Sequence, residues 1–451
     1  MQLLSIKLSY VWSLNHIHTW DLKHNAMKKA SKYNRYVFLD NKFYVYNLLS
    51  RALVCLGAKE IGEKLQSNSF AEFDEDTLNI LERNKIICDS SIDEYLQVLR
   101  LQRIIKYGNK NARLTILPTL NCNFKCWYCY EEHTTRNMSE KECEILLKFC
   151  KNLLDNHHLN SMTLDWFGGE PMLKFANIIV PLSSQVKKLC EEHNVAFYNM
   201  ITTNGALILD KHLADMERIE LNKFQITLDG GKEFHNQTRF SKRHPDSYSC
   251  IVNNICALVK QIPNIDLTLR INCTPSNIDS ITSIIDSFSK EIRDKIHVNL
   301  QPIWQEIESL KALSGNVTEI SRLFHEAGYS VPSFTTLPST PNICYVENML
   351  HYTIVPGLEV YKCTARDFKK GSLNYIGNIS ENGVFVSNDN ILRYYCNSFF
   401  ENSKCKECEV LPVCRGNCIQ KCVESNPLLC QKDDLTRGVD SIIISMIKSM
   451  K

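Results

Sequence analysis

The sequence predicts an α/β protein with a partial (β/α)6 barrel of the TIM type, a small winged-helix-like N-terminal domain and a Cys-rich C-terminal domain. Over about residues 112–302, six β-rich runs alternate with amphipathic helical patterns, which indicates a parallel sheet with right-handed crossovers. Gly, Asn, Asp and Cys residues follow several of these runs, where barrel folds carry their active sites. The last 108 residues hold nine cysteines and few long apolar runs, so we expect metal to stabilise them.

The N-terminal part, residues 1 to about 108, is expected to form a small α/β unit. Residues 36–39 and 43–46 are typical of two strands, joined through Asp40 and Asn41 as a hairpin. Residues 50–66, 76–88 and 92–104 space their apolar residues by three and four, which predicts helices. The winged-helix name rests on this order of elements, which is a fold-level analogy.

The barrel strands are predicted over residues 113–119, 162–167, 196–202, 223–229, 266–272 and 295–302. Ser139 and Glu142 predict a capping box at the start of the first intervening helix. Residues 303–340 are expected to be helix and linker, and the predicted domains are residues 1–108, 109–335 and 336–451. The chemistry-bearing residues that follow the first four strands are Cys122, Gly168-Gly169-Glu170-Pro171, Thr202-Thr203-Asn204-Gly205 and Asp229-Gly230-Gly231.

Composition disfavours two classes of partner. Lys plus Arg number 52 against 50 for Asp plus Glu, so the chain has no charge excess for nucleic acid or an anionic membrane. No apolar run approaches the roughly 18 residues of a membrane span, and the first residues lack a signal-peptide pattern. We therefore expect a cytoplasmic protein with reduced thiols. Cysteines in apolar or mixed segments are expected to be small core residues: Cys55, Cys88, Cys143, Cys150, Cys190, Cys250, Cys256 and Cys273.

Three cysteines within eight residues form the first metal-site candidate. Cys122, Cys126 and Cys129 offer soft thiolates on a loop short enough to close around one metal centre. A [4Fe-4S] cluster prefers four ligands, so three would leave one iron open to a small molecule. The spacing alone also allows a zinc site completed by His133.

The C-terminal cysteines form a second constellation. A Cys-x2-Cys pair with two further cysteines nearby is compatible with a zinc ribbon or with an iron-sulfur site. The nine cysteines are Cys344, Cys363, Cys396, Cys405, Cys408, Cys414, Cys418, Cys422 and Cys430.

The first cysteine cluster resembles the signature of the radical S-adenosylmethionine (SAM) enzymes, with the same spacings and an aromatic residue, Tyr128, before the third Cys. The GGEP and TTNG strand ends also match that family over roughly residues 112–302. The resemblance implies that SAM binds the open iron and is cleaved to a 5'-deoxyadenosyl radical. It places Gly168, Gly169 and Glu170 at the SAM amino group, Thr203 and Asn204 at the ribose, Thr227 nearby, and Arg239 or Arg270 at the carboxylate.

The C-terminal segment resembles the SPASM extension of this family, which carries auxiliary [4Fe-4S] clusters. The resemblance assigns Cys405, Cys408, Cys414 and Cys430 to one cluster and Cys344, Cys363 and Cys418 to the other. Cys396 or Cys422 would supply the fourth ligand of the latter, or one iron would stay open. The sequence departs from the pattern at Leu358, where the family has Gly and this chain has Gly357 one place earlier.

The resemblance implies a ribosomal-peptide maturase whose N-terminal domain recognises a leader peptide and which forms a thioether or carbon-carbon cross-link. It also implies a low-potential electron donor, such as flavodoxin or ferredoxin. An alternative is a sulfatase maturase that makes formylglycine, although Thr364 occupies a position where those enzymes have Asp, and Asp367 lies close by. A non-enzymatic alternative is a zinc or iron-sulfur protein that binds a partner or relays electrons.

Overall fold

The structure is a computed structural model that describes residues 5–6, 27–303, 305, 314–331, 344–396, 403–414, 416, 418–425, 430 and 432–450. The chain divides into two compact units. Unit 1 contains residues 1–107, 335–343 and 398–451, and unit 2 contains residues 108–334 and 344–397. Residues of the predicted C-terminal domain, 336–451, therefore occur in both units.

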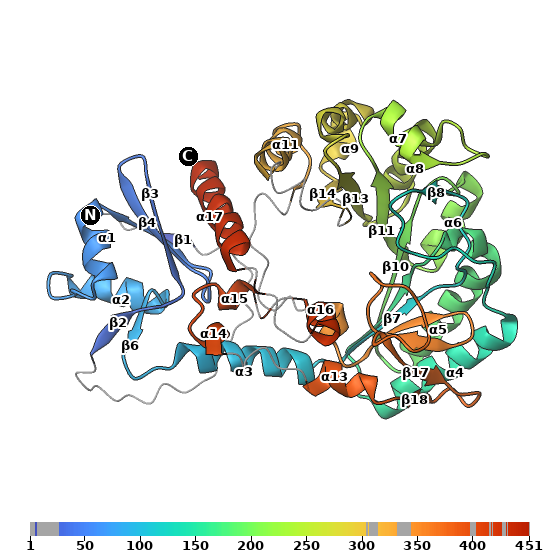
Figure 1. The fold of residues 1–451 in the computed structure, drawn as a ribbon, viewed down its shortest axis with the longest axis horizontal. Coiled ribbons are helices and arrows are strands. Elements are labelled where there is room, and N and C mark those ends of the chain that lie inside the picture. Colours follow the sequence, from blue (N-terminus) through green and yellow to red (C-terminus); the bar gives the residue numbers. More distant parts are fainter. Residues whose placement is uncertain are drawn as a thin grey trace. The chain divides into compact units, whose positions relative to one another are not determined.

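Unit 2 is organised around a ten-stranded sheet whose parallel part is drawn in Figure 1. All six predicted barrel strands are confirmed, they run parallel, and they lie side by side in chain order. A seventh parallel strand adds to the first of them, and three antiparallel strands follow it. Across the sheet the strands are β14 (Ile296–Pro302), β13 (Asp266–Cys273), β11 (Leu221–Leu228), β10 (Ala196–Thr203), β9 (Ser161–Trp166), β7 (Asn111–Ile116), β15 (His351–Val355), β16 (Glu359–Tyr361), β17 (Tyr375–Ile379) and β18 (Phe385–Ser387).

The two faces of the parallel strands differ in polarity because successive side chains alternate between them. One face is apolar and buried, as at Leu114, Leu164 and Ile226. The other face is polar: Thr115 Oγ1 contacts both Asp165 Oδ2 and His351 Nε2 at 3.1 Å. The sheet therefore packs a hydrophobic core on one side and presents hydrogen-bonding groups on the other.

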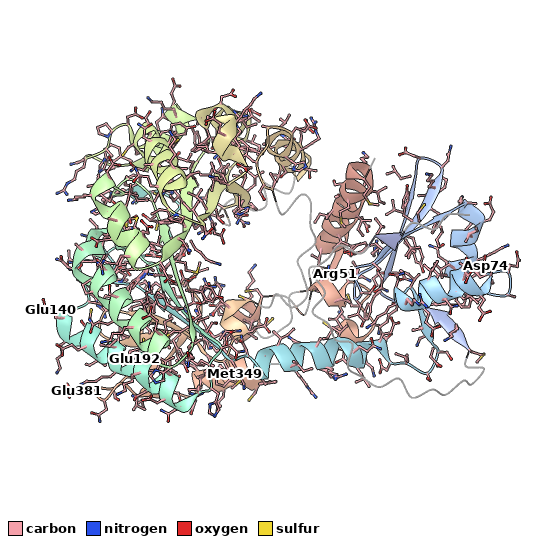
Figure 2. The ribbon with its side chains drawn as sticks, turned by 180° about the vertical axis from the view of Figure 1, so that it is seen from behind. Arg51, Asp74, Glu140, Glu192, Met349 and Glu381 are labelled. Carbon is pink, nitrogen blue, oxygen red and sulfur yellow. The ribbon has the colours of Figure 1, made fainter. Side chains whose placement is uncertain are left out.

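The connections between the parallel strands are mostly helical, as predicted for βα units (Figure 1). The predicted capping box is confirmed: Ser139 Oγ accepts from the backbone N–H of Glu142, and Glu142 caps Ser139 in return. Lys141, in the same first turn, pairs with Glu381 at 2.7 Å, near the labelled Glu140 of Figure 2. The helices of unit 2 are α4 (Glu140–Asn156), α5 (Val180–Glu192), α6 (Asp210–Arg218), α7 (Lys232–Thr238), α8 (Ser247–Gln261), α9 (Lys290–Arg293), α11 (Ser314–Glu326) and α13 (Asn390–Cys396), with short turns η1 (Pro171–Lys174), η2 (Phe175–Ile179), η3 (Ile278–Ser287) and η5 (Tyr345–Glu347).

Unit 1 combines the N-terminal residues with the C-terminal ones. Its antiparallel sheet has the order β1 (Ser5–Ile6), β5 (Leu53–Gly57), β4 (Lys42–Asn47) and β3 (Asn34–Leu39), and a second pair joins β2 (Lys28–Ala30) to β6 (Ile87–Asp89). The predicted hairpin is confirmed, with Asp40 and Asn41 at φ of 49° and 57° in its two-residue turn. Its helices are α1 (Lys59–Gln66), α2 (Glu75–Arg83), α3 (Glu94–Tyr107), α14 (Ser403–Lys406), α15 (Leu411–Cys414), α16 (Ile419–Glu424) and α17 (Lys432–Ser449).

Two of the predicted N-terminal helices are wrong in extent. Residues 53–57 form β5 rather than the start of a helix, because Val54 and its neighbours pair with β4 across a buried face. Residues 76–88 leave the helix after Arg83 and end in β6. Asp74, labelled in Figure 2, caps that shorter helix by accepting from the backbone N–H of Thr77. In both segments tertiary strand pairing outweighed the helical spacing.

The core of unit 1 joins both ends of the chain. Tyr33, Val37 and Tyr95 pack in one apolar cluster with Val439 and Ile443 of α17, which lies along β3 in Figure 1. Arg35 of β3 fixes the same contact through two hydrogen bonds to Asp440, at 2.9 and 2.7 Å. No helix among the described residues is long and apolar enough to span a bilayer.

Candidate functional site

The predicted signature loop lies directly after β7. Its middle forms a short ribbon in which β8 (Lys125–Cys126) pairs antiparallel with β12 (Arg239–Phe240). Cys126 stands opposite Arg239 in this ribbon. Burial raises the pKa of Cys122 to about 12 and also raises the pKa of Cys126. Metal binding requires these thiols to lose their protons, so assembly of a cluster here releases protons. The bound iron offsets the cost of burying the thiolate charges.

The hydroxyl of Tyr128 is the centre of a polar network behind this loop. It receives hydrogen bonds from Arg239 Nη1 at 2.6 Å and Asn272 Nδ2 at 3.1 Å, and it donates to Asp229 Oδ2. Arg239 also pairs with Asp229 at 3.7 Å, with both side chains almost fully buried. Burial acts to lower the pKa of Arg239, but Cys126, Tyr128 and Asp229 outweigh it and raise the pKa well above its ordinary value. The guanidinium therefore stays charged beside the signature loop.

Glu170 joins the ends of two neighbouring strands. Its carboxylate accepts from the backbone N–H of Met172 at 2.9 Å, from Thr203 Oγ1 at 2.7 Å and from the backbone N–H of Asn204 at 2.8 Å. The side chain is fully buried, and burial raises its pKa while these hydrogen bonds oppose the rise. The carboxylate therefore fixes the GGEP loop to the TTNG loop.

Gly169 is required by a close approach of two backbones. A Cβ at this position would meet the carbonyl oxygen of Asn121 at 2.2 Å, and the φ of Gly169 is 30°. The next residue, Glu170, donates its backbone N–H to the same oxygen at 2.8 Å. The glycine that sequence reasoning placed at SAM thus also packs the GGEP loop onto the segment that leads to Cys122.

The remaining predicted contacts are distributed along adjacent strand ends. Asn204 Nδ2 donates to Asn123 Oδ1 at 2.8 Å, which connects the TTNG loop to the signature loop. Thr227 is buried and lies opposite Arg270 in the β11–β13 register. Arg270 donates from Nε to Asn272 Oδ1 at 2.9 Å. The structure therefore brings all the predicted SAM-contact residues to the side of the sheet where its parallel strands end.

A cavity of about 370 Å³ opens on this side, at the ends of the parallel strands. Cys122, Asn123 and Ser241 line it, and the Nδ2 of Asn123 and the Oγ of Ser241 are buried without a hydrogen-bond partner among the described residues. Arg239 Nε is another buried donor without such a partner. Buried polar groups cost free energy unless they are paired, so these atoms are suited to a polar ligand.

The donor set also bears on the kind of metal centre. No group of three or more His, Cys, Asp or Glu side chains, within the residues that the structure describes, is close enough to hold a single metal ion. A single zinc ion needs its sulfurs about 2.3 Å from the metal, whereas an iron-sulfur cubane spans a wider set of thiolates. The soft thiolates of Cys122, Cys126 and Cys129 suit an iron-sulfur cluster as well as zinc, and the family comparison below decides between them.

The C-terminal cysteines of unit 1 gather beside its core. Burial, together with the nearby Cys414, Cys408 and Cys430, raises the pKa of Cys405 to about 11. Cys405, Cys408 and Cys414 all pack against the cluster that contains Tyr33 and Val439. The structure therefore brings together the four residues that the resemblance assigns to one auxiliary cluster.

Two further cysteines lie in unit 2 around Tyr345. Burial raises the pKa of Tyr345, with additional contributions from Cys363 and Cys344. The Tyr345 hydroxyl is 2.5 Å from Thr364 Oγ1. Leu358, where the family has Gly, adopts a left-handed φ of 57° in the turn between β15 and β16. Leu358 therefore occupies the left-handed conformation that glycine adopts most readily.

Sequence reasoning missed several residues of this site. Asp229 was noted as a strand-end residue but given no role, and Asn272 was noted only within a strand, yet both fix the Tyr128 hydroxyl. Asn123 and Ser241 were not singled out. For Ser241, the signal is the alternation of the buried Arg239 and Ser241 with the exposed Phe240 and Lys242, which is typical of a short strand such as β12.

The comparisons with known proteins agree with this site. Residues 116–288 match the family model described as Radical SAM superfamily. A radical SAM cyclopropyl synthase, TigE, of Paramaledivibacter caminithermalis is 22% identical over 351 residues, which is 71% of this chain and 70% of that protein. A cysteine-type anaerobic sulfatase-maturating enzyme of Clostridium perfringens is 24% identical over 342 residues, covering 67% of this chain and 87% of its own.

A solved structure of anSMEcpe with bound AdoMet (SAM) shares the fold, with a TM-score of 0.57 at 17% identity over 75% of this chain and 93% of that chain. The chain therefore carries a radical SAM domain and is an enzyme that uses SAM and a [4Fe-4S] cluster. It is related to maturases, and this sets aside the non-enzymatic alternative.

Proposed function

We propose that the chain is a radical SAM peptide maturase that abstracts hydrogen from a peptide and forms a thioether or carbon-carbon cross-link. Cys122, Cys126 and Cys129 would hold the cluster with one iron open. When bound, the cluster and SAM supply a 5'-deoxyadenosyl radical that removes hydrogen from the substrate. The observation that carries the peptide assignment is a separate unit with a free strand edge beside a polar cavity.

The residues of the chain would divide the binding of SAM between them. The orphaned Nε of Arg239 suits the SAM carboxylate, because the Nη1 of the same side chain is already held by Tyr128. Gly168, Gly169 and Glu170 would lie at the amino group. Thr203, Asn204 and Thr227 would line the ribose side, where hydroxyl and amide groups match its hydroxyls.

Two auxiliary clusters fit the C-terminal cysteines. Cys405, Cys408, Cys414 and Cys430 would bind one, as their grouping in unit 1 supports. Cys344, Cys363 and Cys418 would bind the other, completed by Cys396 or Cys422 or left with one open iron. The resemblance to the SPASM extension implies action on peptides or proteins, so an arrangement of this kind supports the peptide assignment.

The free edge in unit 1 is that of β3. In a two-residue hairpin, the residues that flank the turn, Leu39 and Lys42, hydrogen-bond to each other through both backbone N–H and C=O groups. Along β3, every second residue counted back from Leu39 therefore directs its backbone N–H and C=O toward β4. The backbone N–H of Leu48 donates to Tyr33 O, in agreement with that phase. The N–H and C=O of Tyr36 and Phe38 therefore point away from β4, to the edge that no other strand occupies in the described sheet. Such an edge can pair with an extended leader peptide.

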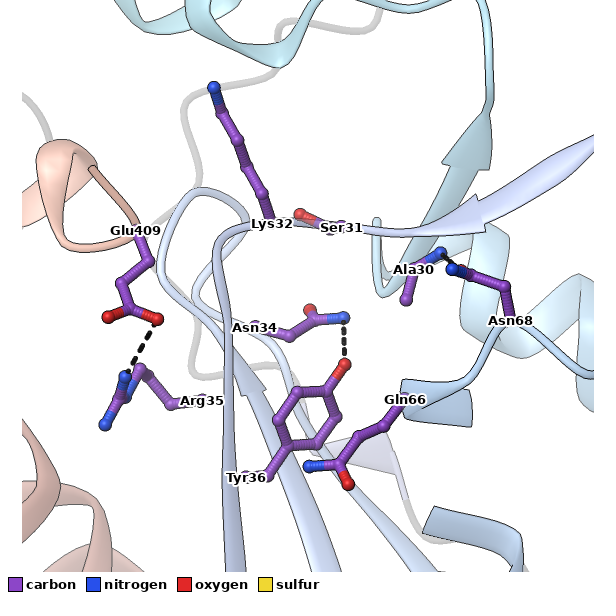
Figure 3. A pocket seen from close by; sticks show the side chains of 9 residues that line it. All are labelled: Ala30, Ser31, Lys32, Asn34, Arg35, Tyr36, Gln66, Asn68 and Glu409. Atoms are coloured by element: carbon purple, nitrogen blue, oxygen red, sulfur yellow. Dashed lines mark hydrogen bonds and ion pairs between the residues drawn. The ribbon is translucent and has the colours of Figure 1, made fainter. Parts of the chain in front are cut away.

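A polar cavity of about 420 Å³ lies beside this edge (Figure 3). Asn34 donates to the Tyr36 hydroxyl at 3.2 Å, and Arg35 pairs with Glu409 at 3.4 Å across one side of it. The lining residues are Ala30, Ser31, Lys32, Asn34, Arg35, Tyr36, Gln66, Asn68 and Glu409. We expect this cavity to receive leader side chains while the strand edge binds the leader backbone. The winged-helix-like description of this unit remains part of the proposal.

The test is a pair of substitutions at Phe38, which is half exposed. Phe38→Pro removes the outward N–H without removing a sheet hydrogen bond, and Phe38→Ala removes the same ring but keeps the N–H. The probe is a synthetic copy of a short Cys- or aromatic-containing peptide encoded beside the gene. Binding is followed by fluorescence anisotropy, and cross-linking is followed as the loss of two hydrogen atoms by mass spectrometry.

We expect Phe38→Pro to weaken peptide binding at least tenfold while Phe38→Ala stays within about threefold of wild type. Equal peptide binding by the two variants would contradict the proposal that the leader peptide pairs with the edge of β3. Deleting residues 1–107 is unsuitable as a test, because it would expose the apolar face of α17.

A sulfatase-maturase activity is the second candidate, and it is favoured by the relative of Clostridium perfringens. Thr364, which contacts the Tyr345 hydroxyl, carries no carboxylate, and Asp367 is paired with Lys369 at 3.1 Å. Mass spectrometry separates the candidates, since formylglycine replaces sulfur with oxygen and a cross-link retains it.

A further inference from the structure

The cysteine turn of unit 1 packs against the start of β3. Three of its cysteines contact the apolar cluster that contains Tyr33, namely Cys405, Cys408 and Cys414. The turn is tight, since the backbone N–H of Cys408 donates to the carbonyl of Cys405 at 3.2 Å. Val410, two residues beyond Cys408, is fully buried in the same cluster. The N-terminal segment therefore lies directly against these cysteines.

Two polar contacts fix this packing within unit 1. Lys32 Nζ donates to the backbone carbonyl of Lys406, inside the Cys-x2-Cys turn, at 2.9 Å. Arg35 pairs at 3.4 Å with Glu409, which directly follows the turn (Figure 3). Lys32 and Arg35 lie on either side of Tyr33 in the sequence. The segment that carries Tyr33 is therefore attached to both ends of the cysteine turn.

The hydroxyl of Tyr33 is a buried donor that lacks an acceptor. The side chain is fully buried, and its Oη has no hydrogen-bond partner among the residues that the structure describes. The pKa of Tyr33 is raised by burial first, and Glu94 and Cys408 are among the nearby groups that add to the rise. The hydroxyl therefore stays protonated, so it can donate a hydrogen bond.

The nearby carboxylate is not the acceptor. Glu94 accepts from Ser31 Oγ through one oxygen and from the backbone N–H of Lys32, at 3.0 Å, through the other. Neither oxygen is bonded to the Tyr33 hydroxyl. A buried polar group costs free energy unless it is paired, so the hydroxyl is suited to a group that occupies the adjacent cysteine site.

We name the auxiliary cluster proposed for Cys405, Cys408, Cys414 and Cys430 the unit 1 cluster. We propose that the hydroxyl of Tyr33 donates a hydrogen bond to a sulfur of the unit 1 cluster and thereby raises the reduction potential of that cluster. Hydrogen bonds to sulfur stabilise the reduced state, because it carries one more negative charge than the oxidised state. Tyr33 is a positioning residue in this role, since it neither binds iron nor transfers its proton. The inference rests on the proposed assignment of the four cysteines.

The chemistry of the donor fits the group. A cluster held by thiolates carries negative charge, and hydrogen bonds to charged acceptors are stronger than those to neutral ones. A tyrosine supplies such a donor while its ring stays in the apolar core. The ammonium of Lys32 lies 5.3 Å from the centroid of the Tyr33 ring and places positive charge on the same side. A buried water is the competing partner of the hydroxyl, and it would leave the potential of the cluster unchanged.

The experiment uses the full chain with the other two iron sites removed, so that only the unit 1 cluster is observed. After anaerobic reconstitution we expect about four iron atoms per chain. The background substitutions are Cys122→Ala, Cys126→Ala, Cys129→Ala, Cys344→Ala and Cys363→Ala. If circular dichroism shows that this background is unfolded, the difference between the chain with all its cysteines and its Cys405→Ala variant isolates the same signal.

Tyr33→Phe is the test variant, because it removes the hydroxyl and keeps the ring in the core. Tyr44→Phe is the matched control. Tyr44 is buried in the same apolar cluster, and its pKa is raised by burial and by Cys55, which is not assigned to a cluster. Both variants therefore lose one tyrosine hydroxyl from one core, but only Tyr33→Phe loses it beside the cysteine turn.

The first readout is the midpoint potential, measured by redox titration with electron paramagnetic resonance. At the wild-type midpoint we expect Tyr33→Phe to lower the ratio of reduced to oxidised cluster about tenfold, which is a shift of about 59 mV for one electron. Tyr44→Phe should stay within twofold. The second readout is electron-nuclear double resonance of the reduced cluster, in which Tyr33→Phe should lose one exchangeable-proton signal that the control keeps.

Equal midpoints in the two variants, or the same exchangeable-proton signals in both, would overturn the hydrogen bond and are the results expected if the hydroxyl binds water. These results leave the unit 1 cluster itself intact, because the iron is still bound. A folded background chain that takes up no iron would overturn the cluster assignment together with the inference. The iron content therefore separates failure of the assignment from failure of the role of Tyr33.

Discussion

The backbone N–H of Asn204 lies 2.8 Å from Glu170 Oε2, and this contact ties together the loops that follow β9 and β10. The same carboxylate also binds Thr203 and the N–H of Met172. One buried side chain therefore sets the relative position of the GGEP and TTNG motifs, which are far apart in sequence. Its removal should affect both motifs at once.

Glu170→Gln should destabilise unit 2 by about 2 to 3 kcal/mol, because the new NH2 group faces donors and leaves a charge-assisted hydrogen bond unmade. This loss is measured by urea unfolding in which hydrogen exchange of the backbone amides of β9 and β10 is the readout. Thr203→Val, which removes only one of the three donors, should cost about 1 kcal/mol. A Gln variant as stable as wild type would show that the carboxylate is not the link between these loops.

Tyr128→Phe should disturb the network without removing the aromatic ring. The hydroxyl has three partners, so its loss leaves Arg239, Asp229 and Asn272 with unmade hydrogen bonds at a cost of about 1 to 3 kcal/mol. We also expect weaker SAM binding, measured by equilibrium dialysis, because Arg239 loses its anchor. Tyr198→Phe, at a half-exposed tyrosine of β10, is the control for loss of a tyrosine hydroxyl. Unaltered SAM affinity in Tyr128→Phe would contradict the positioning role of the hydroxyl.

Cys405→Ala should reduce the iron content of the reconstituted chain from about 12 to about 8 atoms per chain, because it removes a ligand of one auxiliary cluster. Cys55→Ala is the matched control, since Cys55 packs against the same core of unit 1 and is not assigned to a cluster. Iron and sulfide analysis measures the difference. Equal iron content in the two variants would remove Cys405 from the ligand set.

The stability of unit 2 should fall as the pH drops below about 6.5, partly through His351. Burial, with Lys362 and Arg113 nearby, holds the pKa of His351 well below 6.5. The folded state therefore keeps the ring neutral while the unfolded state binds a proton, so each pH unit below 6.5 costs about 1.4 kcal/mol. His351→Gln should lack this part of the slope. Hydrogen exchange of β7 and β15 between pH 7 and pH 5, corrected for intrinsic rates, compares the two proteins, and identical slopes would contradict the assignment.

The parallel sheet could be predicted because its strands are long, regularly spaced and followed by residues that fit strand ends. Alternation of apolar and polar residues, as in Thr115 and Leu114, carried enough information to place all six strands. The spacing of the signature cysteines suggested a metal site but also allowed zinc, so the prediction of a cluster needed Tyr128 and the GGEP and TTNG strand ends as well. Residues 53–57 were assigned to a helix because their apolar spacing fits either element, and only pairing with β4 decides the outcome.

The parts that could not be predicted depend on contacts between distant segments. Asp229 and Asn272 meet Tyr128 only after the sheet brings three strand ends together. The joining of Tyr33 to Val439 in one core is likewise invisible in local patterns, because more than four hundred residues separate them. The sequence therefore indicated which residues carry chemistry. The residues that position them could be identified only from the folded structure.

The central claim is that one iron of the cluster at Cys122, Cys126 and Cys129 has no protein ligand. Mössbauer spectroscopy tests it on protein reconstituted with isotopically enriched iron, in a Cys405→Ala background that removes one auxiliary cluster. We predict that adding SAM changes the signal of a single iron site, and that Cys126→Ala abolishes this change. Spectra that SAM leaves unaltered in the intact signature loop would contradict the account.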